Sequence, residues 1–199
     1  MPRLTPEREE TRRDAILVAA RRVFVEKGLH RATTHDVARE ARVPVGSIYT
    51  YFASKDELIW ASILAANKEE TDTVVRDVRV SGSTRERMRR ALSGWYAYTI
   101  DAPGVATFLA EIWAESTRRP LIRDLVARRR ERMVTVAALI LADGVAAGNL
   151  PAGTDVDTTA RALVNMLDGM TLERLAGDGI LSRAEVERRA MLLLTSAST

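Results

Sequence analysis

Apolar residues recur three and four positions apart along most of the chain, and the strict alternation typical of strands is almost absent. The first such run occupies about residues 7 to 27, with Thr5 at the N-cap position, Pro6 at the first helical position and Gly28 after its end. Its inward face is formed by Ile16, Ala19, Ala20, Val23 and Phe24. The pattern predicts an all-α protein.

Start and stop signals divide the rest of the chain into further helices. The capping-box pattern, a Ser followed three residues later by Glu, begins at Ser54, Ser83 and Ser182. The sequence DAPG at 101–104 breaks the chain, and Pro120 suits the opening of a long helix that closes at Gly148. Another helix is expected from about Asp157 to Ala176. The total is about nine helices, three before residue 53 and six after it.

The sequence PVGSIYTYF at 44–52 has the β-branched and aromatic composition of a strand. A strand here has no partner of similar character, so its backbone groups would lack hydrogen bonds. As a short helix it directs Ile48 and Phe52 toward the two preceding helices. The side chains expected to project outward are Ser47, Tyr49, Thr50 and Tyr51.

A second short helix precedes this one. Thr34 is expected to cap it, Asp36 lies in its first turn, and it ends near Ala41. Helix, three-residue turn and helix together form the arrangement of a helix-turn-helix motif.

Charge is distributed unevenly along the chain. The first 55 residues contain 11 Lys and Arg against 7 Asp and Glu, or +4, whereas the remaining residues contain 19 against 20, or −1. A basic segment attached to a nearly neutral body suits a nucleic-acid partner, although a solvated charged face produces the same local excess.

Composition excludes several kinds of site. The chain has no Cys, which rules out disulfides and thiolate metal sites, and its two His residues, His30 and His35, have no acidic cluster near them in sequence. We therefore expect no metal and no cofactor. The first residues contain no apolar signal core, and the longest apolar run, 133–142, is about half a membrane span. We expect a cytoplasmic protein without a membrane partner.

Glu111 and Glu115 are two carboxylates one helical turn apart, a spacing found in acid–base catalysis. No nucleophile, metal-ligand set or cofactor signature accompanies them in the sequence. We therefore predict no catalytic residues and no enzymatic activity.

Residues 32–58, ATTHDVAREARVPVGSIYTYFASKDEL, resemble the DNA-binding module of the TetR family of bacterial transcriptional regulators. The matching elements are Thr33 and Thr34, Val37 and Ala38, the GSIY sequence at 46–49, Tyr51 and Phe52, and Ser54 and Lys55. The helical remainder extends the resemblance to nearly the whole chain. It implies a helix-turn-helix DNA-binding domain at 1–53 and a ligand-binding and dimerisation domain at 54–199, coupled by the helix that begins after Ser54.

Two features depart from the family pattern. Arg42 occupies the turn position where Gly is usual, which suggests an altered or strained turn. Pro44 and Val45 replace the usual Ser and basic residue at the start of the third helix, so fewer polar groups are available to read DNA.

The resemblance also implies which residues meet DNA. Thr34 and His35 would contact the backbone or groove edge, and Lys55 would contact a phosphate. The reading surface would be Val45, Gly46, Ser47, Tyr49, Thr50 and Tyr51. The alternatives are that Tyr49 or Tyr51 is a half-buried packing residue and that His35 has no role.

The body of the chain is expected to hold a ligand pocket and a dimer interface. The pocket residues would be Trp95, Tyr98, Phe108, Ile112 and Met166, which plain core packing explains equally well, with Glu111, Asn165 and Asp168 as polar candidates. The last two long helices would pack with their copies about a two-fold axis. Gly169 lies there among apolar residues that include Val164, Leu167 and Leu175.

These observations predict a homodimeric, TetR-like repressor that binds a pseudo-palindromic double-stranded DNA operator and is released by a small apolar or amphipathic molecule. One alternative is a constitutive DNA-binding protein whose body is filled. The other is a helical small-molecule carrier or enzyme whose first three helices merely complete a bundle.

Overall fold

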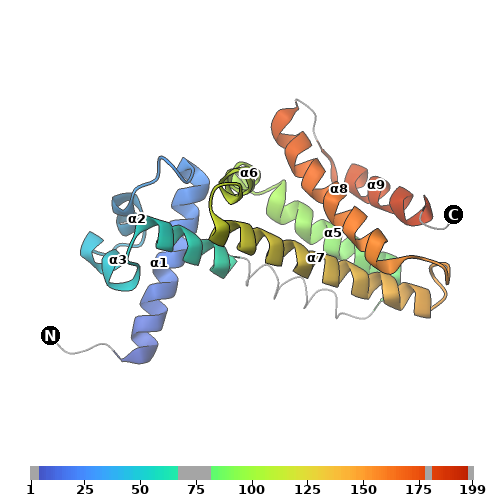
Figure 1. The fold of residues 1–199 in the computed structure, drawn as a ribbon, viewed down its shortest axis with the longest axis horizontal. Coiled ribbons are helices and arrows are strands. Elements are labelled where there is room, and N and C mark those ends of the chain that lie inside the picture. Colours follow the sequence, from blue (N-terminus) through green and yellow to red (C-terminus); the bar gives the residue numbers. More distant parts are fainter. Residues whose placement is uncertain (1–4, 67–81, 178–180, 197–199) are drawn as a thin grey trace. The chain divides into compact units, whose positions relative to one another are not determined.

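The computed structural model describes residues 5–66, 82–177 and 181–196, and these residues form helices joined by short turns (Figure 1). No strand occurs in this part of the chain, which confirms the all-α prediction. The helices are α1 (Pro6–Lys27), α2 (Thr34–Glu40), α3 (Val45–Tyr51), a helix described over residues 55–66, α5 (Thr84–Thr99), α6 (Val105–Ser116), α7 (Pro120–Ala146), α8 (Val156–Ala176) and α9 (Arg183–Ser196).

The described residues pack into two compact units. The first unit contains residues 5–66 and 107–125, and the second contains 82–106, 126–177 and 181–196. The division therefore falls inside α6 and inside α7. The separation into a DNA-binding domain at 1–53 and a body at 54–199 is a division by role, and it remains a prediction.

Helix α1 begins and ends where the sequence predicts. Thr5 is its N-cap and Pro6 its first residue, and its inward positions, Ile16, Ala19, Ala20, Val23 and Phe24, are all buried. Gly28 follows the last turn with φ +79°, a backbone conformation that favours glycine, and its amide donates to the Phe24 carbonyl at 2.9 Å.

Helix α2 is capped by Thr33, so the prediction that Thr34 caps it is wrong by one residue. The Thr33 hydroxyl accepts from the Asp36 amide at 3.1 Å, and the Asp36 carboxylate accepts from the Thr33 amide at 3.0 Å. This reciprocal capping box needs the acidic residue three positions after the cap, which only Thr33 satisfies. Thr34 instead lies inside the helix and is buried, with 8% of its surface exposed.

The turn between α2 and α3 has the hydrogen bonds of a Schellman motif. The Val43 amide donates to the Ala38 carbonyl at 2.9 Å, and the Arg42 amide donates to the Arg39 carbonyl at 3.2 Å. Arg42 takes the left-handed position with φ +54°, where glycine is usual. The turn therefore has the geometry of a glycine-type helix end, and a residue with a side chain adopts the unfavourable conformation.

Helix α3 is short, and its packing matches the sequence pattern. Ile48 and Phe52 are buried, at 1% and 2% exposure, and α2 packs against both α1 and α3. Pro44 occupies the N-cap position without a side-chain hydrogen bond. The strand alternative for 44–52 is thereby excluded.

The second unit has its own hydrophobic core, built from α5, the later part of α7, α8 and α9. Helix α9 packs against both α5 and α8 (Figure 1). Ser83 forms the capping box predicted for it, and Gly148 ends α7 with φ +71°. Val164 and Leu167 belong to this core, so they are packing residues of the unit itself. Among the described residues, no helix combines the length and apolar character needed to cross a membrane.

Candidate nucleic-acid interface and the neighbouring polar pocket

The outward face of α3 presents polar and aromatic groups to solvent. Gly46, Tyr49 and Thr50 are exposed, and 54% of the Tyr49 surface is accessible. Because Ile48 and Phe52 anchor the opposite face, these exposed groups are held on a firmly packed helix. Exposed hydroxyls and one aromatic ring suit contact with phosphate oxygens and base edges.

Two hydrogen bonds organise this face. The hydroxyls of Thr34 and Tyr49 lie 3.2 Å apart, and the Thr50 hydroxyl donates to the Gly46 carbonyl at 3.2 Å. The first bond joins α2 to α3 through two of the residues predicted to meet DNA. Thr34 therefore supports the Tyr49 side chain from a buried position.

The remaining predicted reading residues are less exposed. Val45, Ser47 and Tyr51 are half-buried, so Ser47 and Tyr51 do not project outward as far as expected. The Tyr51 ring lies 6.5 Å from the Phe52 ring, which shows that part of its surface is used for packing. His35 is exposed in the first turn of α2.

The start of α2 is tied to the end of α1 by charge. The Lys27 ammonium lies 2.6 Å from the Asp36 carboxylate, and Arg39 lies 3.1 Å from the same carboxylate. The hydrogen bond from Lys27, followed by those from Thr33, holds the pKa of Asp36 well below its ordinary value. The carboxylate that closes the α2 cap is therefore ionised at neutral pH.

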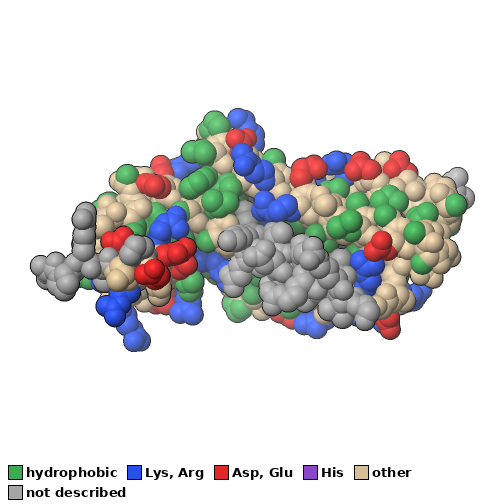
Figure 2. All heavy atoms as spheres, turned by 90° about the horizontal axis from the view of Figure 1, so that it is seen from below, with side chains coloured by type: hydrophobic (Ala, Val, Ile, Leu, Met, Phe, Trp, Pro, Cys, Tyr) green, Lys and Arg blue, Asp and Glu red, His purple; other side chains and the backbone are tan. Residues whose placement is uncertain are grey.

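Sequence reasoning missed a cation beside this module. The Arg13 guanidinium lies over the Phe52 ring, 5.4 Å from its centroid. Basic and acidic side chains are otherwise interspersed over the described residues of the face in Figure 2. Neither sign of charge forms a large continuous patch on that face.

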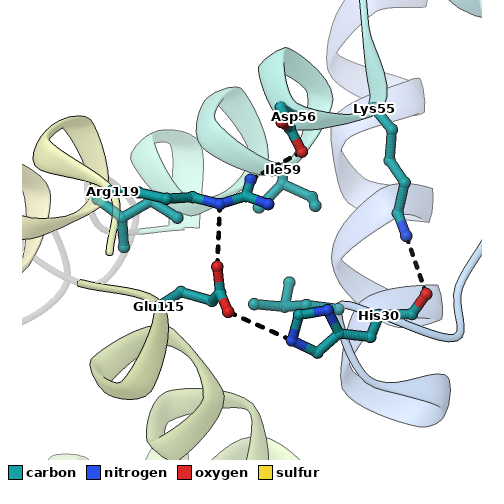
Figure 3. Close-up of a pocket in the computed structure, with 8 residues that line it drawn as sticks. His30, Lys55, Asp56, Ile59, Glu115 and Arg119 are labelled. Carbon is teal, nitrogen blue, oxygen red and sulfur yellow. Dashed lines mark hydrogen bonds and ion pairs between the residues drawn. The ribbon is translucent and has the colours of Figure 1, made fainter. Parts of the chain in front are cut away.

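A polar pocket lies in the first unit beside this module (Figure 3). It is lined by Leu29, His30, Lys55, Asp56, Ile59, Glu115, Arg119 and Ile122. Lys55, the predicted phosphate contact, donates here to the His30 carbonyl at 3.1 Å. The hydrogen bond to Asp56 raises the pKa of the Arg119 guanidinium above its ordinary value, although burial acts in the opposite direction. The negative charges of Asp56 and Glu115 add to the increase. Within the described part of the chain, no group of His, Asp and Glu side chains is arranged to hold a metal ion.

The structure gives Glu111 and Glu115 definite partners. Glu111 accepts from the Leu29 amide at 2.6 Å, and Glu115 lies 3.3 Å from His30 and 2.9 Å from Arg119. Glu115 is buried. Both carboxylates of the pair thus bind the segment between α1 and α2, a role that their spacing alone did not indicate.

The residues predicted to line a ligand pocket are distributed over both units. Phe108 and Ile112 are buried in the first unit. Trp95 belongs to the core of the second, and Met166 packs against that core. Tyr98 is half-buried in the same unit. One pocket lined by all five residues remains a prediction.

Two of the polar pocket candidates, Asn165 and Asp168, share a partner on α7. The Asn165 side-chain oxygen accepts from Arg130, and the Asp168 carboxylate lies 3.5 Å from the same guanidinium. These contacts join α8 to α7 inside the second unit.

Helices α8 and α9 expose large apolar side chains. Leu172 is 50% exposed on α8 and Leu192 is 56% exposed on α9, and Leu175 is also exposed. Gly169 lies one turn from Leu172, and an added Cβ there would meet nothing within 4 Å. This face is open in the single chain.

Comparison with known proteins matches both parts of the chain. The model for bacterial regulatory proteins of the tetR family matches residues 16–61, and the model for the C-terminal part of BetI-type transcriptional repressors matches residues 84–197. The HTH-type transcriptional regulator HbdR of Aromatoleum sp. (strain CIB) is 34% identical over 125 residues, which cover 60% of this chain and 53% of that protein. UidR of Escherichia coli (strain K12) is 24% identical over 166 residues, covering 83% of each.

Solved structures share the fold at low sequence identity. A transcriptional regulator from Saccharomonospora viridis in complex with choline has a TM-score of 0.79 and 24% identity, covering 92% of this chain and 95% of that one. FadR from Bacillus subtilis in complex with stearoyl-CoA has a TM-score of 0.75 and 19% identity, covering 92% and 98%. The helix-turn-helix match and a C-terminal match over more than half of the 199 residues agree with this fold, and the chain therefore belongs to the TetR family of bacterial transcriptional regulators.

Proposed function

We propose that this regulator is a non-enzymatic, cytoplasmic repressor that binds a pseudo-palindromic DNA operator as a homodimer and is released by a small apolar or amphipathic ligand. The observation that carries the proposal is the exposed face of α3. Gly46, Tyr49 and Thr50 lie on this face, and Ile48 and Phe52 anchor the opposite side of the helix. Hydroxyls and an aromatic edge on a rigid short helix have the chemistry of major-groove contacts.

The homodimer is supported by the open face of α8 and α9. Leu172, Leu175 and Leu192 expose apolar surface, and Gly169 leaves room for close approach of another helix. Two copies of this face about a two-fold axis would form a four-helix interface. Two reading helices would then meet half-sites separated by about one DNA turn or a multiple of it.

A ligand-responsive body is supported by relatives of the same fold. The neighbours are in complex with choline, a small cation, and with stearoyl-CoA, which carries a long acyl chain. In this chain the buried side chains Trp95 and Phe108 are the aromatic groups proposed to contact such a ligand. The ligand lowers DNA affinity only if the DNA-binding conformation binds the ligand more weakly than the other conformation does.

The experiment is selection of bound fragments from random duplex DNA, followed by affinity measurement on the selected sequence. Wild-type protein should select a sequence with inverted half-sites, and Thr50→Ala should relax discrimination at one symmetric position by about 1–3 kcal/mol. Thr135→Ala is a matched control, because Thr135 also donates to a carbonyl four residues earlier but lies on α7. Absence of salt-dependent duplex binding would favour the carrier alternative and reject the proposal.

A further inference from the structure

Two residues of the segment between α1 and α2, Leu29 and His30, are held by side chains from α6. Glu111 accepts from the Leu29 amide at 2.6 Å, and Glu115 contacts the His30 imidazole at 3.3 Å. The two carboxylates lie one turn apart, so they face the same side of the helix. Adjacent loop residues are thus bound by adjacent turns of α6.

The backbone of this segment is shaped to admit the first carboxylate. A Cβ added to Gly28 would lie 2.6 Å from a Glu111 carboxylate oxygen, and the glycine has φ +79°. Any side chain at this position would displace Glu111 as well as strain the turn. The close approach of Glu111 to the loop therefore requires Gly28.

Arg119 joins Glu115 to the helix at 55–66 (Figure 3). Arg119 lies 2.9 Å from Glu115 and 2.7 Å from Asp56, and Lys55 donates to the His30 carbonyl. Loop, helix and the segment after α6 are therefore connected by a ring of polar contacts that closes through the adjacent residues Lys55 and Asp56. Arg119 compensates the buried negative charge of Glu115.

We propose that Glu111 and Glu115 are positioning residues for DNA recognition. They fix the loop that leads into α2, and α2 supports the reading face through the Thr34–Tyr49 hydrogen bond at 3.2 Å. Operator affinity is therefore set partly by α6, which carries none of the reading residues. The inference rests on the proposed function and names residues outside the reading face that support it.

The geometry makes this contact sensitive to small displacements. A hydrogen bond of 2.6 Å is lost when its atoms separate beyond about 3.5 Å, so a shift of α6 by about 1 Å is sufficient to release Leu29. The helix at 55–66, expected from the sequence to couple the two functions, shares the ring through Lys55 and Asp56.

The test compares variants of each carboxylate. Glu111→Ala removes the acceptor for the Leu29 amide, whereas Glu111→Gln keeps an acceptor oxygen. Glu115→Gln removes the negative charge that lies beside both Arg119 and His30. Glu187→Gln is the matched control, because Glu187 pairs with Arg89 at 3.0 Å in the second unit.

Operator affinity is measured per active molecule, by stoichiometric titration with the selected duplex. Glu111→Ala and Glu115→Gln should bind at least about five-fold more weakly, which is the lower end of typical coupling between sites. Glu111→Gln should recover most of the affinity, and the control should match wild type. The salt dependence should remain unchanged in all variants, because no phosphate contact is removed.

Hydrogen exchange of the Leu29 amide gives a readout independent of DNA binding. Exchange should be faster in Glu111→Ala than in wild type, and nearly normal in Glu111→Gln. The inference is overturned if Leu29 exchanges at the wild-type rate in Glu111→Ala. It is equally overturned if Glu111→Ala and Glu115→Gln bind the operator within two-fold of a wild type that itself binds well. Failure of the wild type to bind any duplex would instead reject the proposed function.

Discussion

The left-handed backbone of Arg42 gives the most direct test of the energetics of this DNA-binding module. Arg42 has φ +54° in a Schellman motif at the end of α2, and it makes no ion pair within the described residues. A residue with a Cβ costs roughly 1–2 kcal/mol in this conformation. Replacement by glycine removes that cost but adds about 0.5–1 kcal/mol of unfolded-state entropy.

Arg42→Gly should therefore raise the free energy of unfolding by about 0.5–1 kcal/mol. In a chain of this length, that corresponds to an increase of about 2 °C in the unfolding midpoint. The measurement is urea and thermal unfolding followed by circular dichroism, with separate phases fitted if the two units unfold separately.

Gly148 supplies the reverse substitution in the same motif. The Asn149 amide donates to the Gly144 carbonyl at 2.8 Å and the Gly148 amide to Val145 at 3.0 Å, with φ +71° at Gly148. An added Cβ at Gly148 meets nothing within 4 Å, so Gly148→Arg tests conformation without steric overlap. Gly148→Arg should lower the free energy of unfolding by a similar amount. If Gly148→Arg behaves this way but Arg42→Gly lowers stability, backbone strain at Arg42 is refuted.

The remaining predictions concern DNA, assembly, packing and pH. Lys55→Ala should weaken all duplexes similarly and lower the salt slope by about 0.9 per lost phosphate contact; an unchanged slope removes Lys55 from the interface. Gly169→Arg should be monomeric in sedimentation and keep normal helical content, because the new arginine side chain meets open space in the single chain. A fully dimeric variant would place the interface elsewhere. Thr99→Val should leave the urea-unfolding free energy unchanged or higher, because the buried Thr99 hydroxyl has no hydrogen-bond partner among the described residues, whereas a clear loss would reveal a hidden partner. The Lys27 hydrogen bond lowers the pKa of Asp36, so the stabilisation by the Asp36 carboxylate is present above about pH 4 and is lost as pH falls through the lower folded pKa. The difference in unfolding free energy between wild type and Asp36→Asn should therefore shrink in acid, and a constant difference would contradict this.

Local features of the fold were predictable from the sequence because they depend on neighbouring residues. The proline at the start of α1, the glycine at its end and the capping box at Ser83 each act within a few positions, and all three occur as expected. The one-residue error at Thr34 arose because two adjacent threonines compete for the same cap. Only the position of Asp36 decides between them.

The contacts between α6 and the segment before α2 were not predictable by such reasoning. Leu29 and Glu111 are 82 positions apart in the sequence, and no local pattern relates a loop amide to a carboxylate at that distance. The spacing of Glu111 and Glu115 was visible, but it is equally compatible with catalysis, a solvated face or a structural contact. The burial of Val164 and Leu167 likewise depends on how α8 packs within its unit, since periodicity identifies an apolar face without naming its partner.

The two carboxylates of α6 also restrict how that helix can move. A slip by one residue would turn both side chains by about 100° around the helix axis and remove them from the loop together. A slip by one full turn, about 5.4 Å, would bring Glu115 to the level that Glu111 now occupies. Opposite Leu29 and His30, α6 therefore has discrete favourable positions along its axis. A small displacement loses both contacts, whereas a displacement by one whole turn preserves one of them.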